Sequence, residues 1–209
     1  MKPEDHSFSF GLNPFTDGLE AAGNDVMLAL ALHHGDESDQ HFRRSFVRTG
    51  FAFTESSISA VRAIGLQMHE LAEEAANHLP DGTRPKQLSP HEHLLLQDRQ
   101  FIIGPNGRPK EIDYFASTGP RLLFALRTLA SLFEREDLVD TGSHQWGEFK
   151  MSIKLRDRLT HPKTIDDLVV SDDDMAMVIR SMEWSRSVAA GLMGAGIDHL
   201  ERLGGTAGI

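Results

Sequence analysis

Apolar residues recur at helical spacing through most of this chain, and this periodicity constrains the fold more than any other feature. Between Ser45 and Leu79 they repeat at intervals of three and seven residues, until Pro80 and the sequence DGTRP end the segment. The stripe consists of Phe51, Ile58, Val61, Met68 and Leu71. Because this spacing places the side chains on one helix face, we expect one long helix, bent near Gly65.

Three more helices are expected further along the chain. One should begin at Thr118, with Pro120 in its first turn, and its stripe consists of Leu122, Leu126, Leu129 and Phe133. A second should run from about Ser143 to Thr160. The last should follow Ser171, because Asp174 three residues later forms a variant of the capping box. These segments together predict an all-α helical bundle.

The remaining segments are expected to surround this bundle. Residues 1–44 should form an N-terminal arm and a helical extension, in which Thr16 or Asp17 can cap a helix and HHGDESDQ forms a loop. Residues 80–117 should be an insertion carrying a β-hairpin, QFIIGPNGRPKEID. The bundle domain proper should cover residues 45–200, and residues 201–209 should form a flexible tail.

Composition narrows the class of protein. A length of 209 residues suits a single domain, and the absence of cysteine excludes disulfides and thiolate metal sites. The N-terminus lacks the pattern of a signal peptide, and no run approaches the ~20 apolar residues that span a bilayer. We therefore expect a cytoplasmic protein with no membrane contact and no cofactor. A formal net charge of −10 argues against binding nucleic acid through bulk charge.

One segment reverses this acidic balance. Between Glu148 and Lys163 the chain has five cations and two acids, and the cations are Lys150, Lys154, Arg156, Arg158 and Lys163. Arg156 continues the apolar stripe of its helix. Since a guanidinium cannot lose its proton, it needs an anionic partner or a wet groove, and a phosphate would serve.

The same helix should end at His161, because Pro162 disfavours helical geometry in the residue before it. A helix C-terminus favours a protonated imidazole, and Asp157 lies four residues earlier, within reach to orient the ring. The segment thus combines a permanent cation, a titratable group and a carboxylate.

The sequence Arg156-Asp157-Arg158-Leu159-Thr160-His161-Pro162 resembles the Arg, polar residue, spacer, His signature of HEPN proteins, the higher eukaryotes and prokaryotes nucleotide-binding superfamily. The motif also stands ahead of the last core helix, as it does in that family. The resemblance implies a HEPN-like helical bundle over roughly residues 45–200. It further implies a homodimer in which two copies of the motif form one cleft.

Many members of this family are metal-independent endoribonucleases of toxin–antitoxin systems and phage defence. The resemblance therefore implies RNA as substrate and an antitoxin protein as a partner. It makes Arg156 the phosphate clamp, His161 the general acid or base, and Asp157 its orienting group. Lys154, Arg158 and Lys163 would contact RNA, and the reaction would need no metal.

Simpler interpretations stay open beside this one. Arg156, Asp157 and His161 can form a structural ion-pair set, and the cations can be a solvated helix face. Glu55 can cap, pair with Arg156 or face solvent. His91-Glu92-His93 and His33-His34 lack a third ligand at a spacing typical of metal sites. The rival function is a non-catalytic HEPN-like module that binds a nucleotide, RNA or a protein partner.

Overall fold

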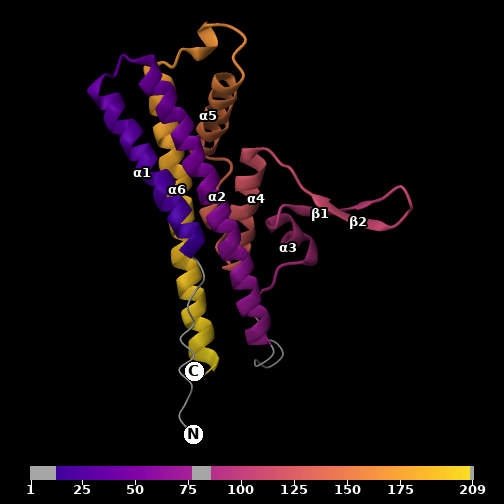
Figure 1. Cartoon of the computed structure of the whole chain (residues 1–209). Helices are drawn as coiled ribbons and strands as arrows, with labels where there is room; N and C mark the ends of the chain where they lie inside the picture. The colour runs from indigo at the N-terminus through magenta and orange to yellow at the C-terminus, as the bar shows by residue number, and fades with distance from the viewer. Residues whose placement is uncertain (1–12, 77–85, 208–209) are drawn as a thin grey trace.

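A computed structural model describes residues 13–76 and 86–207. Within these ranges the chain is mostly helical, with one small antiparallel sheet (Figure 1). The helices are α1 (Asn13–Gly35), α2 (Gln40–Ala76), α3 (Pro90–Leu96), α4 (Thr118–Leu132), α5 (His144–Thr160) and α6 (Asp172–Ala207). The strands are β1 (Arg99–Ile103) and β2 (Pro109–Asp113), and two 3-10 turns cover Glu136–Leu138 and Asp166–Leu168. The expected mostly helical fold with a small hairpin is confirmed.

Two apolar clusters hold the long helices together. The larger joins α2, α4, α5 and α6, and its fully buried members include Leu126, Leu129, Phe149 and Leu192. The rings of Trp146, Phe149 and Trp184 pack together in it, with centroids 5.5–5.6 Å apart. The Trp146–Phe149 pair is therefore part of the core.

The smaller cluster joins α1, α2, the end of α5 and the start of α6. Its members include Phe46, Val47, Leu159, Val170 and Val178, each at most 2% exposed. This cluster supports the end of α5, where the predicted functional residues lie.

Several helices follow the sequence pattern closely. The expected stripe of α4 is buried throughout. The α6 capping box forms as predicted: the Asp174 N–H donates to Ser171 Oγ at 3.1 Å, and the Ser171 N–H donates to Asp174 Oδ2 at 3.0 Å. In α5, Ser143 caps the helix by accepting the Trp146 N–H at 3.2 Å.

Other boundaries differ from the expectations. Helix α1 starts at Asn13, before the expected caps Thr16 and Asp17, and the loop after it is confined to residues 36–39. Helix α2 starts at Gln40 and so runs through the expected boundary between residues 44 and 45. Helix α6 continues to Ala207, through most of the segment expected to be a flexible tail. The arm before residue 13 and Pro80 lie outside the described residues.

Helix α3 was not expected from the sequence. Ser89 caps it and Pro90 opens its first turn. The Glu92 N–H donates to Ser89 Oγ at 3.2 Å, and the Ser89 N–H donates to Glu92 Oε2 at 2.8 Å, which completes a capping box. The sequence SPHE carries this signal.

Gly65 allows three helices to approach closely. A Cβ at this position would lie 2.8 Å from Leu129 Cδ1 of α4 and 3.2 Å from Leu96 Cδ1 of α3. The glycine therefore allows close packing between α2 and its neighbours.

Over the described part of the chain, none of the helices has the length and apolarity needed to cross a bilayer.

The hairpin projects from the body beside α3 and α4 (Figure 1). Its strands pair antiparallel, with Phe101 opposite Glu111 and Ile103 opposite Pro109. Asp98 at its base has a positive φ of 57° and fixes the hairpin to two helices. Its carboxylate accepts Arg62 of α2 at 2.5 Å and Arg121 of α4 at 2.9 Å, and its carbonyl accepts the Tyr114 N–H at 2.6 Å.

Candidate functional site

Helix α5 ends at the residue that the sequence predicts. His161 leaves the helical region with φ −127° and ψ 59°, because Pro162 follows it, and its N–H donates to the Asp157 carbonyl at 2.9 Å. The residue is exposed, and no hydrogen bond of its imidazole is found among residues 13–76 and 86–207. The ring is therefore open to solvent and to a ligand.

Arg156 lies between two carboxylates. Its Nη2 donates to Glu55 Oε1 of α2 at 2.8 Å, and its Nη1 donates to Asp157 Oδ1 at 3.2 Å. The Thr118 hydroxyl at the start of α4 donates to the same Glu55 oxygen at 3.3 Å. Of the three roles left open for Glu55, pairing with Arg156 is the one observed. About a third of the Arg156 side chain remains exposed.

Asp157 does not orient His161 in the way expected. Its side chain faces Arg156, and within the described chain its contact with His161 is made by its main-chain carbonyl. Helix geometry explains the difference, because His161 has already left the helix and its side chain no longer lies one turn above Asp157. The roles of Arg156, Asp157 and His161 in catalysis remain predictions.

The three cations predicted to contact RNA have different surroundings. Arg158 donates to the Val169 carbonyl at 3.0 Å and to Asp174 Oδ2 at 3.4 Å, so it holds the connector between α5 and α6. Lys154 and Lys163 are exposed. Lys154 borders a groove of about 590 Å3 between α4 and α5, which Leu123 and Ile153 also line. Of these three cations, Lys154 and Lys163 are therefore the ones whose charge is available to a ligand.

The connector after His161 is ordered by Asp167. Its Oδ2 accepts the main-chain N–H groups of Lys163 and Thr164, each at 2.8 Å, and the Thr164 hydroxyl at 3.1 Å. The hydrogen bond from the Lys163 N–H, followed by that from Thr164, lowers the pKa of the Asp167 carboxyl. At neutral pH the Asp167 carboxylate is therefore ionised, and it accepts hydrogen bonds from the loop that follows His161.

Arginines of α2 also hold this connector, and the sequence analysis did not predict them. The buried Arg43 donates to the carbonyls of Glu37 at 2.6 Å and Val170 at 2.9 Å, and it pairs with Asp172. Arg44 donates to the Leu168 carbonyl at 3.1 Å. The sequence signal that could have revealed them is FRRSFVR, in which arginines stand between apolar residues of the predicted long helix.

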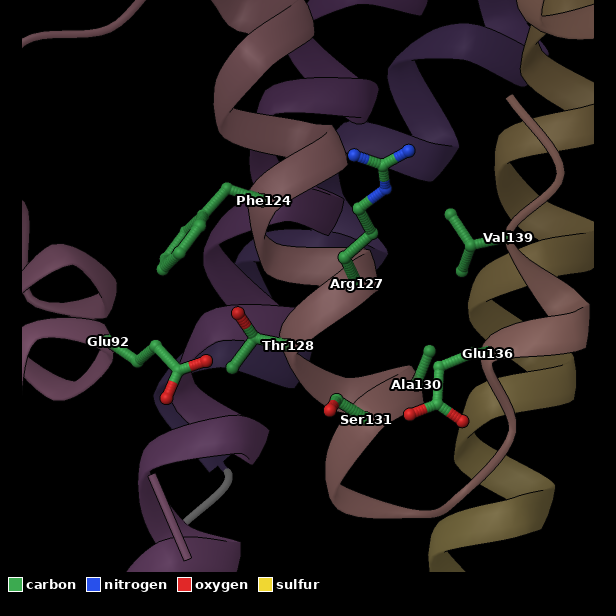
Figure 2. Close-up of a pocket in the computed structure, with 8 residues that line it drawn as sticks. All are labelled: Glu92, Phe124, Arg127, Thr128, Ala130, Ser131, Glu136 and Val139. Carbon is green, nitrogen blue, oxygen red and sulfur yellow. The ribbon is translucent and has the colours of Figure 1, made fainter. Parts of the chain in front are cut away.

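A pocket of about 470 Å3 lies on the surface of α4, away from this site (Figure 2). Figure 2 shows Glu92 and Glu136 on opposite sides of it. Both carboxylates already have partners, because Glu92 completes the α3 cap and Glu136 lies 3.8 Å from Lys86 Nζ. None of the predicted site residues lines this pocket.

The histidines that raised the question of a metal site do not assemble one. In the part of the chain that is described, no three His, Asp or Glu residues are placed to share a metal ion. His93 instead packs against His69, with ring centroids 5.2 Å apart.

Comparison of the chain with protein families, curated proteins and solved structures finds no match. The resemblance to HEPN proteins therefore depends on residues 156–162 and their place before the last helix.

Proposed function

We propose that this chain is a HEPN-type endoribonuclease that acts as a homodimer in the cytoplasm and cleaves RNA without a metal ion. The observation that supports this most is the presence of two exposed groups at the end of one helix. The imidazole of His161 has no hydrogen bond over residues 13–76 and 86–207, and the guanidinium of Arg156, five residues earlier, is partly exposed. The proposal extends the resemblance of this segment to the HEPN signature.

The proposed reaction needs a proton acceptor, a proton donor and a cation. His161 of one copy takes the proton of the 2′-hydroxyl, and the 2′-oxygen then attacks the adjacent phosphorus. The bond from phosphorus to the 5′-oxygen breaks, and a protonated His161 of the second copy gives that oxygen a proton. The products are a 2′,3′-cyclic phosphate and a 5′-hydroxyl, so DNA is not a substrate.

Arg156 retains the capacity to bind a phosphate although it has two carboxylate partners. A guanidinium has five N–H groups, and the contacts with Glu55 and Asp157 use one on each terminal nitrogen. The other donors remain for the phosphate oxygens, whose charge rises during the reaction. In this proposal the carboxylates fix the guanidinium in place before RNA binds.

The decisive experiment follows cleavage of labelled single-stranded RNA in the presence of a chelator. Wild type should produce fragments with 2′,3′-cyclic phosphate ends. His161→Ala should lose roughly 100-fold or more in rate, as expected for a general acid or base. His144→Ala is the matched control, because His144 is exposed on the same helix and its nearest carboxylate is Glu148, 3.6 Å away.

The control should retain wild-type cleavage and thermal stability. Equal loss of activity in both histidine variants, or cleavage by His161→Ala at the wild-type rate, would contradict the assignment. A bacterial defence or toxin–antitoxin setting, with an antitoxin as partner, remains part of the proposal through the resemblance alone.

A non-catalytic binding module is the second candidate, and the two carboxylates on Arg156 favour it. They neutralise the guanidinium in the same way as a structural ion pair between α2 and α5. This candidate predicts RNA or nucleotide binding with no cleavage. Under it, Arg156→Ala would lower the free energy of unfolding, because it removes this ion pair, and His161→Ala would change neither binding nor stability.

A further inference from the structure

The groove between α4 and α5 has an apolar wall that belongs to the helical bundle. Leu123 and Phe124 of α4 and Ile153 of α5 line it. Each of these side chains is partly buried, because it also packs against the larger apolar cluster. A Cβ at Gly119 would lie 3.1 Å from Ile153 Cδ1, so the start of α4 touches α5 closely. The wall is therefore a fixed surface.

Three exposed cations border this wall, and they are Arg127, Lys150 and Lys154. None of them forms an ion pair within the described part of the chain. Arg127 donates to the Thr141 hydroxyl at 3.1 Å, and Lys150 Nζ lies 5.9 Å from the centroid of the Trp146 ring. These neutral partners position the two side chains and leave their charge available to a ligand.

The charge of the groove differs from that of the whole chain. The sequence has 31 acidic and 21 basic residues, yet none of the described residues that line the groove is acidic. Such a surface attracts anions, and its apolar wall favours an anion that also has a flat apolar body. A nucleotide combines both properties, with a phosphate for the cations and a base for the wall.

The groove lies next to the candidate site. Lys154 is two residues before Arg156 on α5. Thr118, at the start of α4, donates to the Glu55 carboxylate that pairs with Arg156. From Lys154 to His161 the helix advances roughly 10 Å, at about 1.5 Å per residue. A polynucleotide strand bound at Arg156 and His161 is therefore long enough to continue into the groove.

We propose that this groove binds the nucleotides of single-stranded RNA that flank the scissile phosphate. Arg127, Lys150 and Lys154 contact the phosphates, and a base lies against Leu123 and Phe124. A duplex keeps its bases stacked on one another and cannot present one to this wall. The inference rests on the proposed function for its choice of RNA as substrate, but its test measures binding and not cleavage.

A labelled single-stranded RNA with 2′-O-methyl groups tests the groove, because it has no free 2′-hydroxyl and stays intact. Fluorescence anisotropy with the full chain should show about tenfold weaker binding for the double variant Lys150→Ala/Lys154→Ala. The slope of log affinity against log salt concentration should also become shallower by about 1.4, since each phosphate contact to a single strand contributes about 0.7.

The matched control is Arg108→Ala/Lys110→Ala, which changes the net charge equally. Both residues are exposed on the hairpin, and neither forms an ion pair in the described chain. This variant should bind the oligonucleotide within about twofold of wild type, with an unchanged salt slope. Equal weakening in the two double variants would show that total charge governs binding. That result, or wild-type binding by Lys150→Ala/Lys154→Ala, would overturn the proposal.

Pro120→Glu tests the groove through a variant that should fold well. Pro120 is exposed, lines the groove and lies in the first turn of α4, where an acidic residue stabilises a helix. The variant should unfold at or above the wild-type temperature. It should bind the oligonucleotide several-fold more weakly, because the new carboxylate repels phosphate. Unchanged binding by this folded variant would contradict the assignment.

Inorganic polyphosphate distinguishes a nucleotide site from a general anion site. It has a charged phosphate chain and no bases, so it should compete with the labelled oligonucleotide much more weakly than unlabelled RNA does at equal phosphate concentration. Equal competition would show that the groove binds anions without a contact to the base, and the proposal would be wrong.

Failure of the groove and failure of the nuclease are distinguishable. If Lys150→Ala/Lys154→Ala binds normally while His161→Ala loses cleavage, the groove assignment is wrong and the nuclease stands. If the lysine variant binds weakly and the wild-type chain cleaves no RNA, the groove assignment stands and the chain is a non-catalytic binding module.

Discussion

Arg156 of α5 and Glu55 of α2 form an ion pair of 2.8 Å although 101 residues separate them in the chain. Glu55 also accepts the hydroxyl of Thr118, so the same carboxylate links three helices beside the candidate site. In the proposed function, we therefore expect Glu55 to compete with a phosphate for Arg156.

Glu55→Gln should raise the affinity of the chain for single-stranded RNA by a few-fold, because it removes a negative charge that competes with phosphate for Arg156. The free energy of unfolding should fall by less than about 1 kcal/mol, since both side chains are partly solvated. Fluorescence anisotropy and chemical denaturation measure the two effects.

The control for this change is Glu148→Gln, which alters the net charge equally. Glu148 pairs with Arg180 at 2.6 Å, and this contact lowers the pKa of its carboxyl. An equal rise in RNA affinity in both variants would show that total charge, and not Arg156, governs binding.

Gly65→Ala should destabilise the fold by about 1–3 kcal/mol, since the new methyl group would lie 2.8 Å from Leu129 Cδ1 in a close-packed core. This cost exceeds the gain of up to ~1 kcal/mol that alanine brings to a helix interior. The matched variant is Gly147→Ala in α5, where a Cβ meets nothing within 4 Å. It should stabilise the chain by roughly 0.5–1 kcal/mol, and thermal unfolding should give opposite signs.

Ser171→Ala should cost about 1 kcal/mol of stability, because it removes the acceptor for the Asp174 N–H at the start of α6. Ser187→Ala changes an exposed serine in the interior of the same helix and should be neutral or slightly stabilising. Similar losses in urea denaturation of both variants would show that the cap contributes nothing specific.

Asp167→Asn should destabilise the chain at neutral pH, and the difference from wild type should shrink as the pH falls. The pKa of Asp167 is lower in the folded chain than in the unfolded one, so its contribution is complete above the ordinary carboxyl pKa of about 4 and is lost as the pH falls through the folded value. Denaturation curves at pH 7 and near pH 3 measure this. A difference that grows on acidification would contradict the proposed hydrogen bonds.

The helices could be predicted where local chemistry determines them. The α4 stripe, the Ser171–Asp174 cap and the end of α5 before Pro162 all depend on neighbours within one turn. Helix α6 was expected to fray beyond residue 200, since its Gly-rich end is a poor helix former. The structure nevertheless continues the helix to Ala207. Helix α3 was missed because its apolar run is too short for periodicity to be visible.

The candidate site could be predicted only in part. The sequence places Arg156, Asp157 and His161 at one helix end, but the choice of partner for Arg156 depends on Glu55 of a distant helix. The same limit applies to Arg43, whose partners Val170 and Asp172 lie more than 120 residues away. Long-range pairs of this kind are set by tertiary packing, which one sequence does not reveal.

The grouping of Trp146 with Trp184 has a practical consequence for spectroscopy. The chain has two tryptophans, and both belong to one aromatic cluster where α5 meets α6. Tryptophan fluorescence emission therefore reports on that junction and is nearly insensitive to α1, whereas far-ultraviolet ellipticity reports on every helix. If α1 detaches before the rest, the ellipticity will change on heating while the emission stays constant.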